Sequence, residues 1–392
     1  MKVAINGIGV AGPTLAWWLR ASGHEPVLFE KAPALRTGGY IIDLWGLGYD
    51  IAERMGLVPA LRERCYEMQW LSMVNARGRE VASLDLGPMR ELLHGRFISI
   101  ARSDLSAALF GACKGIPAHF GQWVAGVEEV PDGVVATLSD GRRERFDLVI
   151  GAGGLHSHLR EVVFGPESRF ERPLGCYVAA FRLPGYPWRD ELTYVSHTVP
   201  RRQVGRVALR NDETLVLLVC RAELIGAGPP GDRLKAALRR AFGDMRWEVP
   251  DILDRMDQVD DLYFDRVSQI HLPSWSAGRV ALLGDAAACP SLLAGEGTGL
   301  AMAEAYVLAG ELHRAGGDFA RAYAAYDARL RVFVTAKQKA ALRFRGFFAP
   351  KNSLAVRMRT FAVNALSNRL LARRFLARSV RDDLDLPEYL AA

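Results

Sequence analysis

Six residues near the start of the chain constrain its fold more than any other feature. The run Gly7-Ile8-Gly9-Val10-Ala11-Gly12 lies between the β-rich residues 2–6 and residues 13–21, whose apolar side chains recur at helical spacing. In a G-x-G-x-x-G turn the first glycine permits the sharp turn, the second lets the backbone approach a pyrophosphate, and the third lets the helix pack on the strand. Glu30 ends the next apolar run, where a carboxylate can accept hydrogen bonds from a ribose. The pattern predicts a Rossmann-like unit that binds a dinucleotide through Gly7, Gly9, Val10, Ala11, Gly12 and Glu30.

A second glycine-rich segment follows the apolar residues 280–283. It begins with Gly284-Asp285 and continues through Pro290 to Gly295-Glu296-Gly297-Thr298-Gly299, which open a helix. An aspartate at a strand end can accept a hydrogen bond from a ribityl or ribose hydroxyl, and the helix start supplies N–H donors and a positive dipole. The alternative is a strand–loop–helix whose glycines only permit close packing. The candidate cofactor residues here are Asp285, Pro290, Gly295, Gly297 and Thr298.

The order and spacing of these two segments resemble the flavoprotein aromatic hydroxylases built like para-hydroxybenzoate hydroxylase, over residues 1–320. In that family the first glycine turn and its acidic residue bind the ADP part of FAD. The late Gly-Asp pair binds the ribityl–pyrophosphate region, and the proline-to-glycine loop borders the flavin ring. An arginine that opens a helix after a strand also contacts FAD, and Arg102 matches it. Read alone, Arg102 is equally explained as a solvated helix start.

Within the family the chain most resembles the branch with tetracycline destructases and antibiotic-tailoring hydroxylases. The similar segments are Arg36-Thr37-Gly38-Gly39 with Asp43, residues 284–291, residues 305–312 and the additional C-terminal helical segment. The resemblance implies that Arg36 and Asp43 lie beside the flavin. The family also has a middle motif, matched here by residues 151–160. The chain departs from the family at Gly153 of this motif, where aspartate is usual, and at Ala288, where histidine is usual. The Gly153 substitution bears on nicotinamide handling and on the rigidity of its loop.

The resemblance implies an enzyme in which NADPH or NADH reduces FAD and O₂ forms a flavin C4a-hydroperoxide that hydroxylates a substrate. The expected substrate is a small aromatic or polyketide-like molecule, with a tetracycline-type antibiotic as a narrower hypothesis. No catalytic side chain and no metal site are assigned, because the flavin performs the chemistry. His156 and His158 are expected to be structural or exposed, and Asp265 to lie on a solvated strand edge. A reductase of the same fold that inserts no oxygen remains the alternative.

The expected architecture is α/β, with a Rossmann-like FAD-binding domain, an inserted antiparallel β-sheet substrate domain and C-terminal helices. The change to strand-like segments separated by Pro, Asn and Asp from residue 175 onward indicates the inserted sheet. The expected limits are 1–67, 96–165 and 277–330 for the FAD-binding domain, 68–95 and 166–276 for the substrate domain, and 331–392 for the helical segment.

Charge and cysteine content exclude several other classes of protein. The net charge is +6, but residues 331–392 hold 13 Lys and Arg against 4 acidic residues, so the rest of the chain is slightly acidic. This distribution, without a nucleic-acid-binding motif, argues against a nucleic-acid partner. Five scattered cysteines form no C-x-x-C pair, which favours a reducing cytoplasm over disulfides or zinc. We expect a cytoplasmic monomer or homodimer.

The tail between residues 354 and 380 has apolar residues at helical spacing, including Met358 and Phe361, and continues with Leu370 and Phe375. Asn364 and Ser367 fall on the opposite face. We expect the apolar face to pack on the body and brace the substrate domain. A basic amphipathic helix lying on an anionic membrane is the alternative.

Overall fold

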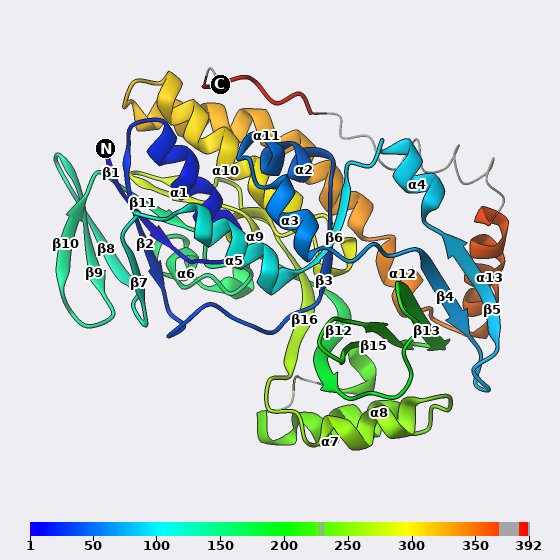
Figure 1. The fold of residues 1–392 in the computed structure, drawn as a ribbon. Helices are drawn as coiled ribbons and strands as arrows, with labels where there is room; N and C mark the ends of the chain where they lie inside the picture. Colours follow the sequence, from blue (N-terminus) through cyan, green and yellow to red (C-terminus); the bar gives the residue numbers. More distant parts are fainter. Residues whose placement is uncertain (227, 229–230, 368–383, 391–392) are drawn as a thin grey trace.

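The computed structural model describes residues 1–226, 228, 231–367 and 384–390 (Figure 1). Its first layer is a six-stranded sheet in which neighbouring strands are parallel except at the β17–β18 edge. In spatial order the strands are β17 (Ser276–Ala277), β18 (Val280–Leu282), β11 (Leu148–Gly151), β1 (Lys2–Asn6), β2 (Glu25–Glu30) and β7 (Ala118–Phe120).

Successive side chains of β1 point to opposite faces of this sheet, and both faces are buried. Val3 and Ile5 enter a large apolar core shared with the helices, whereas Ala4 faces a smaller core under a three-stranded sheet. The helices of the first face are α1 (Ala11–Ala21), α2 (Gly46–Arg54), α3 (Val58–Arg64), α5 (Arg102–Ala112) and α10 (Gly297–Arg314). The second face carries β8 (Val124–Val130), β9 (Gly133–Leu138), β10 (Arg143–Phe146) and α6 (His158–Phe164).

The second layer is a seven-stranded sheet that is antiparallel except where β13 and β4 run parallel. Figure 1 shows α7 (Gly231–Phe242) and α8 (Val249–Met256) on the side of this sheet that faces away from the six-stranded sheet. In spatial order its strands are β16 (Tyr263–Ile270), β12 (Glu171–Pro184), β15 (Glu213–Arg221), β14 (Arg202–Ala208), β13 (Thr193–Val199), β4 (Trp70–Val74) and β5 (Glu80–Asp85).

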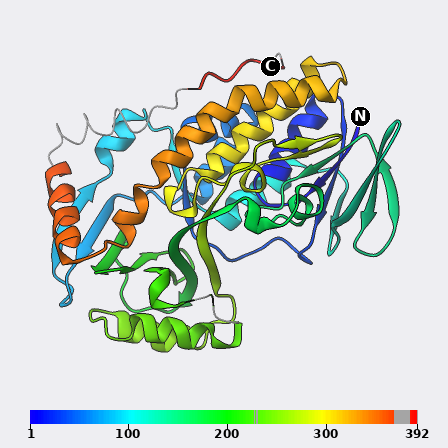
Figure 2. The same ribbon diagram turned by 180° about the vertical axis from the view of Figure 1, so that it is seen from behind.

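The remaining elements connect the two layers. A two-stranded ladder pairs β3 (Ile41–Trp45) with β6 (Phe97–Ala101), and the short helices are α4 (Gly87–Leu92) and α9 (Asp285–Ala288). Figure 2 shows the long helix α11 (Phe319–Ala341) running toward α12 (Phe344–Phe348) and α13 (Ser353–Leu366). The predicted α/β class with an inserted sheet and C-terminal helices is confirmed, whereas the residue limits of the domains stay a prediction.

Helix α13 packs with the face opposite to the one expected. Asn364 Nδ2 donates a hydrogen bond to the carbonyl oxygen of Val81 at 3.0 Å, and Ser367 Oγ donates to that of Ser83 at 2.6 Å. These carbonyls belong to β5, the edge strand of the seven-stranded sheet, whose free backbone acceptors need partners. Met358 and Phe361 are exposed instead. The expectation that this apolar stripe is buried is therefore wrong.

The rest of the predicted tail helix, including Leu370 and Phe375, lies outside the described residues. Within the described residues, none of the helices has the length and apolar character needed to cross a membrane.

Candidate active site

The first glycine turn is held by close backbone contacts around one open position. Gly7 has φ +128°, and a Cβ placed there would lie 2.4 Å from the carbonyl oxygen of Ala152. A Cβ on Gly12 would lie 2.0 Å from the carbonyl oxygen of Gly7. A Cβ on Gly9 would meet no heavy atom within 4 Å. Gly7 and Gly12 are thus required by the fold, whereas the space over Gly9 is open to a ligand.

Glu30 binds the turn itself. Its Oε2 accepts a hydrogen bond from the Ile8 amide at 2.8 Å, and its Oε1 accepts one from the Ala32 amide at 2.9 Å. A carboxylate has about four lone-pair positions, so both oxygens retain acceptor capacity for a hydroxyl. That Glu30 binds a ribose stays a prediction. Its hydrogen bonds to the Ile8 and Ala32 amides show that it also fixes the conformation of the turn.

The second glycine segment packs against the first. Gly284 has φ +63°, and a Cβ there would lie 3.2 Å from the Cβ of Ala11. Asp285 follows at the start of α9, and a Cβ on Gly297 would lie 3.5 Å from its Oδ1 and 3.8 Å from Pro290 Cγ. The structure therefore brings Asp285, Pro290 and the first residue of α10 together, as the sequence predicted.

Arg102 faces this group from α5. Burial raises the pKa of Asp285, and the positive charge of Arg102 opposes that rise. The Arg102 guanidinium lies over the ring of Tyr40, 5.9 Å from its centroid. A Cβ on Gly39 would lie 3.6 Å from Arg102 Cβ, so the loop before β3 is adjacent as well. The interpretation of Arg102 as merely a solvated helix start does not fit this position.

The other predicted residues occupy the surroundings. Asp43, on β3, lines a pocket together with Glu296 and Gly299. Asp43 is accessible to solvent, but the protein around it desolvates the carboxylate and raises its pKa, and the hydrogen bond that it accepts from Ser99 Oγ opposes the rise. Thr298 lies in the first turn of α10, and Arg36 is exposed on the loop after β2.

The loop before α10 has a strained backbone. Gly295 has φ +72°, and Ser291 has φ +136°, a conformation that non-glycine residues adopt only when the surrounding structure enforces it. Its hydroxyl oxygen accepts a hydrogen bond from the Leu293 amide at 3.2 Å. Strain of this kind is common beside ligand sites.

The middle motif ties the two glycine segments together. Ser157 caps α6 by accepting a hydrogen bond from the Arg160 amide at 3.2 Å. The fully buried guanidinium of Arg160 donates to the carbonyl oxygen of Ala286 at 3.2 Å and forms an ion pair with Glu167 at 2.6 Å. At Gly153 a Cβ would meet Ser157 only at an ordinary 3.5 Å. Glycine is therefore not sterically required at position 153, and the loop is braced without an aspartate.

Comparison with known proteins identifies the family. A family model described as an FAD binding domain matches residues 1–323. The chain belongs to this FAD-binding family. A flavin-dependent monooxygenase from an unknown prokaryotic organism is 34% identical over 390 residues, which cover 99% of each chain.

Two solved structures of tetracycline destructases also resemble this FAD-binding protein. Tet(51) is 30% identical with a TM-score of 0.82 and covers 99% of each chain. Tet(55) is 29% identical with a TM-score of 0.85 and covers 99% of this chain and 98% of its own. The chain is a flavin-dependent monooxygenase, and its cofactor is FAD.

Glu304 of this FAD-binding protein was not identified from the sequence. Its side chain is completely buried behind Gly284. Its Oε2 accepts a hydrogen bond from the Gly284 amide at 2.6 Å, while its Oε1 has no hydrogen-bond partner among the described residues. Burial raises its pKa to about 8. At neutral pH the side chain is therefore mostly protonated and adds little negative charge beside Asp285. A glutamate about two turns inside an apolar helix was the available signal.

Replacing Glu304 with glutamine should change how stability depends on pH. The pKa of Glu304 is 4.5 unfolded and about 8 folded, so between these values the folded state holds a proton that the unfolded state has lost. The free energy of unfolding must then fall as pH rises through this window, by roughly 1.4 kcal/mol per unit and about 5 kcal/mol in all. Glu304→Gln should remove this fall. Urea denaturation at pH 5 and pH 8 measures it, with exposed Glu25→Gln as control; an unchanged pH dependence in Glu304→Gln would contradict it.

Asp265 also differs from expectation, whereas His156 is exposed as expected. His156 Nε2 lies 3.0 Å from Asp265 Oδ1, and the Asp265 side chain is only 18% exposed. Asp265 does lie on β16, an edge strand of the seven-stranded sheet, but the expectation that its side chain is solvated is wrong. The two residues are 109 positions apart, so no local pattern could have paired them.

Proposed function

We propose that this monooxygenase uses NADPH or NADH to hydroxylate a planar aromatic or polyketide-like molecule, with tetracycline-type antibiotics as the leading class. The likeness to two tetracycline destructases over nearly the whole of each chain carries the proposal. If only the cofactor domain were similar, the substrate class would stay open. Here the similarity also covers the seven-stranded sheet and the C-terminal helices, because it extends over 99% of this chain.

The proposed FAD site uses the residues brought together above. FAD phosphates would lie over Gly9 at the start of α1, where the backbone is open and the helix dipole favours negative charge. Asp285 would accept a hydrogen bond from the ribityl chain, and the N–H groups at the start of α10 would face the flavin ring. Arg102, which neighbours Asp285, would help to hold the flavin. When bound, FAD supplies the electron transfer and the activation of O₂.

The proposed substrate site lies where this group meets the seven-stranded sheet. An apolar cluster there contains Met68, Ala180, Val207, Leu209 and Leu215, with Tyr40 and Tyr263 packed against it. Tyr40 also neighbours Arg102. This cluster would exclude water and bind a flat apolar ring system next to the flavin, which orients the substrate and protects the reduced cofactor.

NADPH oxidation across a substrate panel tests the proposal. Phenols, anthracyclines and tetracyclines should be added singly to the FAD-loaded enzyme with NADPH, then with NADH. We expect a tetracycline or a related polycycle to accelerate oxidation, and only a weak preference for NADPH, because no second dinucleotide motif is present in the sequence. Loss of antibiotic activity should accompany tetracycline turnover. Equal NADPH oxidation with and without every compound would favour the reductase alternative.

A further inference from the structure

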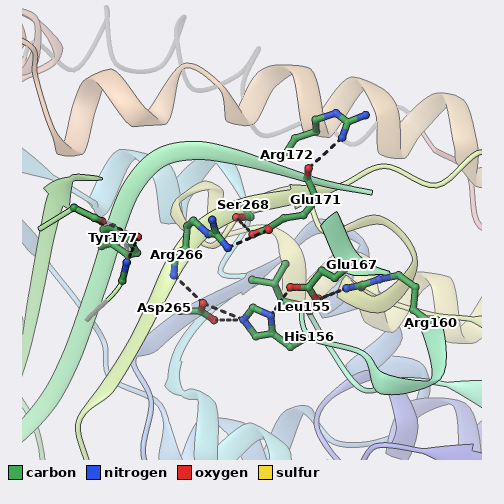
Figure 3. Close-up of polar contacts among 12 residues, drawn as sticks. Leu155, His156, Arg160, Glu167, Glu171, Arg172, Tyr177, Asp265, Arg266 and Ser268 are labelled. Atoms are coloured by element: carbon green, nitrogen blue, oxygen red, sulfur yellow. Dashed lines mark hydrogen bonds and ion pairs between the residues drawn. The ribbon is translucent and has the colours of Figure 1, made fainter. Parts of the chain in front are cut away.

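A chain of polar side chains leads from the surface toward the site, and Figure 3 shows its outer part at His156, Glu167 and Asp265. His156 lies between two carboxylates: its Nδ1 is 2.9 Å from Glu167 Oε1 and its Nε2 is 3.0 Å from Asp265 Oδ1. On the other side of Asp265, the Tyr263 hydroxyl donates a hydrogen bond to Oδ2 at 3.3 Å. The chain links the loop after β11 to strand β16 of the substrate sheet.

The two ends of this chain lie in different environments. The His156 side chain is 55% exposed and reaches water. The Tyr263 ring lies 6.0 Å from the Tyr40 ring, and the charge of Arg102 acts on both phenols. Tyr263 also packs against the apolar cluster of the proposed substrate site. The chain therefore joins solvent to the junction of the proposed flavin and substrate sites.

The exposed end carries an exchangeable proton at neutral pH. The hydrogen bond to Asp265 raises the pKa of His156 to about 9, with Glu167 adding to the rise and burial opposing it. The groups that face the imidazole are Glu167 from the segment after α6 and Asp265 from β16, and Arg160 binds the far side of Glu167. His156 is thus an imidazolium below about pH 9, in contact with water.

Monooxygenation consumes protons as well as electrons. Inserting one oxygen atom of O₂ and reducing the other to water takes two electrons and two protons, and a hydride donor brings both electrons but only one proton. We propose that His156, Asp265 and Tyr263 conduct the second proton from water to the reaction site. The inference rests on the proposed function, because it places the reaction beside Tyr263.

The transfer balances at each atom. The Tyr263 hydroxyl, which donates to Asp265 at rest, turns toward the site. Its O–H bond breaks toward the oxygen atom of O₂ that is reduced to water, and the hydroxyl re-forms with a proton from Asp265. Asp265 takes that proton from the His156 imidazolium, whose Nε2–H bond breaks. The neutral imidazole then regains a proton from water at its exposed edge. The net result is one proton moved from solvent to the site, with every side chain returned to its starting state.

The test compares His156→Gln with His158→Gln in the FAD-loaded, full-length enzyme. His158 is exposed two residues away, and its Nε2 lies 3.3 Å from the backbone carbonyl oxygen of Ala125. His156→Gln and Tyr263→Phe should lower kcat roughly 100-fold, the low end for proton transfer by a placed side chain because water can partly substitute. FAD retention and the rate of flavin reduction by NADPH should be unchanged. His158→Gln should behave as wild type.

Two readouts separate proton conduction from a structural role. The wild-type kcat should fall above about pH 9, where His156 loses its proton, and this fall should vanish in His156→Gln. Histidine NMR of the resting protein should show one imidazole that titrates near pH 9 and shifts downward in Asp265→Asn. An ordinary His156 titration, or a His156→Gln enzyme with wild-type kcat, would overturn the inference. A wild type that binds no FAD or inserts no oxygen would instead overturn the proposed function.

Discussion

Gly7→Ala should unfold far more easily than the wild type, whereas Gly9→Ala should fold normally and lose FAD. An alanine at position 7 must adopt φ +128° and place its Cβ 2.4 Å from a backbone oxygen. Backbone strain and overpacking of this kind together cost about 3–5 kcal/mol. An alanine at position 9 meets no protein atom, so its stability should stay within about 0.5 kcal/mol of wild type.

The Gly9 methyl group should instead fill the space that a pyrophosphate needs. We expect FAD affinity to fall at least tenfold, about 1.4 kcal/mol. Urea denaturation of the FAD-free proteins and fluorescence titration with FAD measure the two effects separately. If Gly9→Ala binds FAD as tightly as wild type, the cofactor phosphates do not lie over this turn.

Asp285→Ala should weaken FAD binding roughly 10- to 100-fold. The expected loss is that of a hydrogen bond to a charged group, about 1.5–3 kcal/mol. Burial raises the pKa of Asp285 in the FAD-free site, so removing the carboxylate should not destabilise the protein itself. FAD retained after gel filtration, set against thermal stability, measures both effects.

The control for this variant is Asp260→Ala, because Asp260 is exposed and precedes β16. Asp265 is unsuitable, since it belongs to the proton chain with His156 and Tyr263. If Asp285→Ala and Asp260→Ala lost FAD equally, this result would contradict the proposal that Asp285 binds FAD.

The glycine turns were predictable because their requirements are local. Gly7, Gly12 and Gly284 each satisfy a backbone conformation or a close approach that spacing along the chain reveals. The strand and helix around each turn follow from the same short pattern. The positions of Arg102 and Asp285 relative to each other came from the family resemblance, because 183 residues separate them and no local rule pairs them.

The rest depended on tertiary contacts. Glu304 is buried because it reaches the Gly284 amide across a helix–loop contact, and helical periodicity alone gives a glutamate no reason to point inward. For α13, the apolar pattern favoured burial of Met358 and Phe361. Instead, the opposite face of α13 packs on β5, where Asn364 and Ser367 donate hydrogen bonds to backbone carbonyls of the edge strand. A pattern read on one helix cannot include the hydrogen-bonding needs of a strand 280 residues earlier.

Labelled oxygen tests the central claim most directly, namely that this chain inserts oxygen into an organic substrate at its flavin site. The enzyme, as purified with its FAD, should be given NADPH, ¹⁸O₂ and the compound that most stimulates NADPH oxidation. Mass spectrometry of the product should show one ¹⁸O atom per molecule, and Asp285→Ala should form the same product more slowly until FAD is added in excess. Product that carries oxygen only from water, or NADPH oxidation without any oxygenated product, would contradict the account.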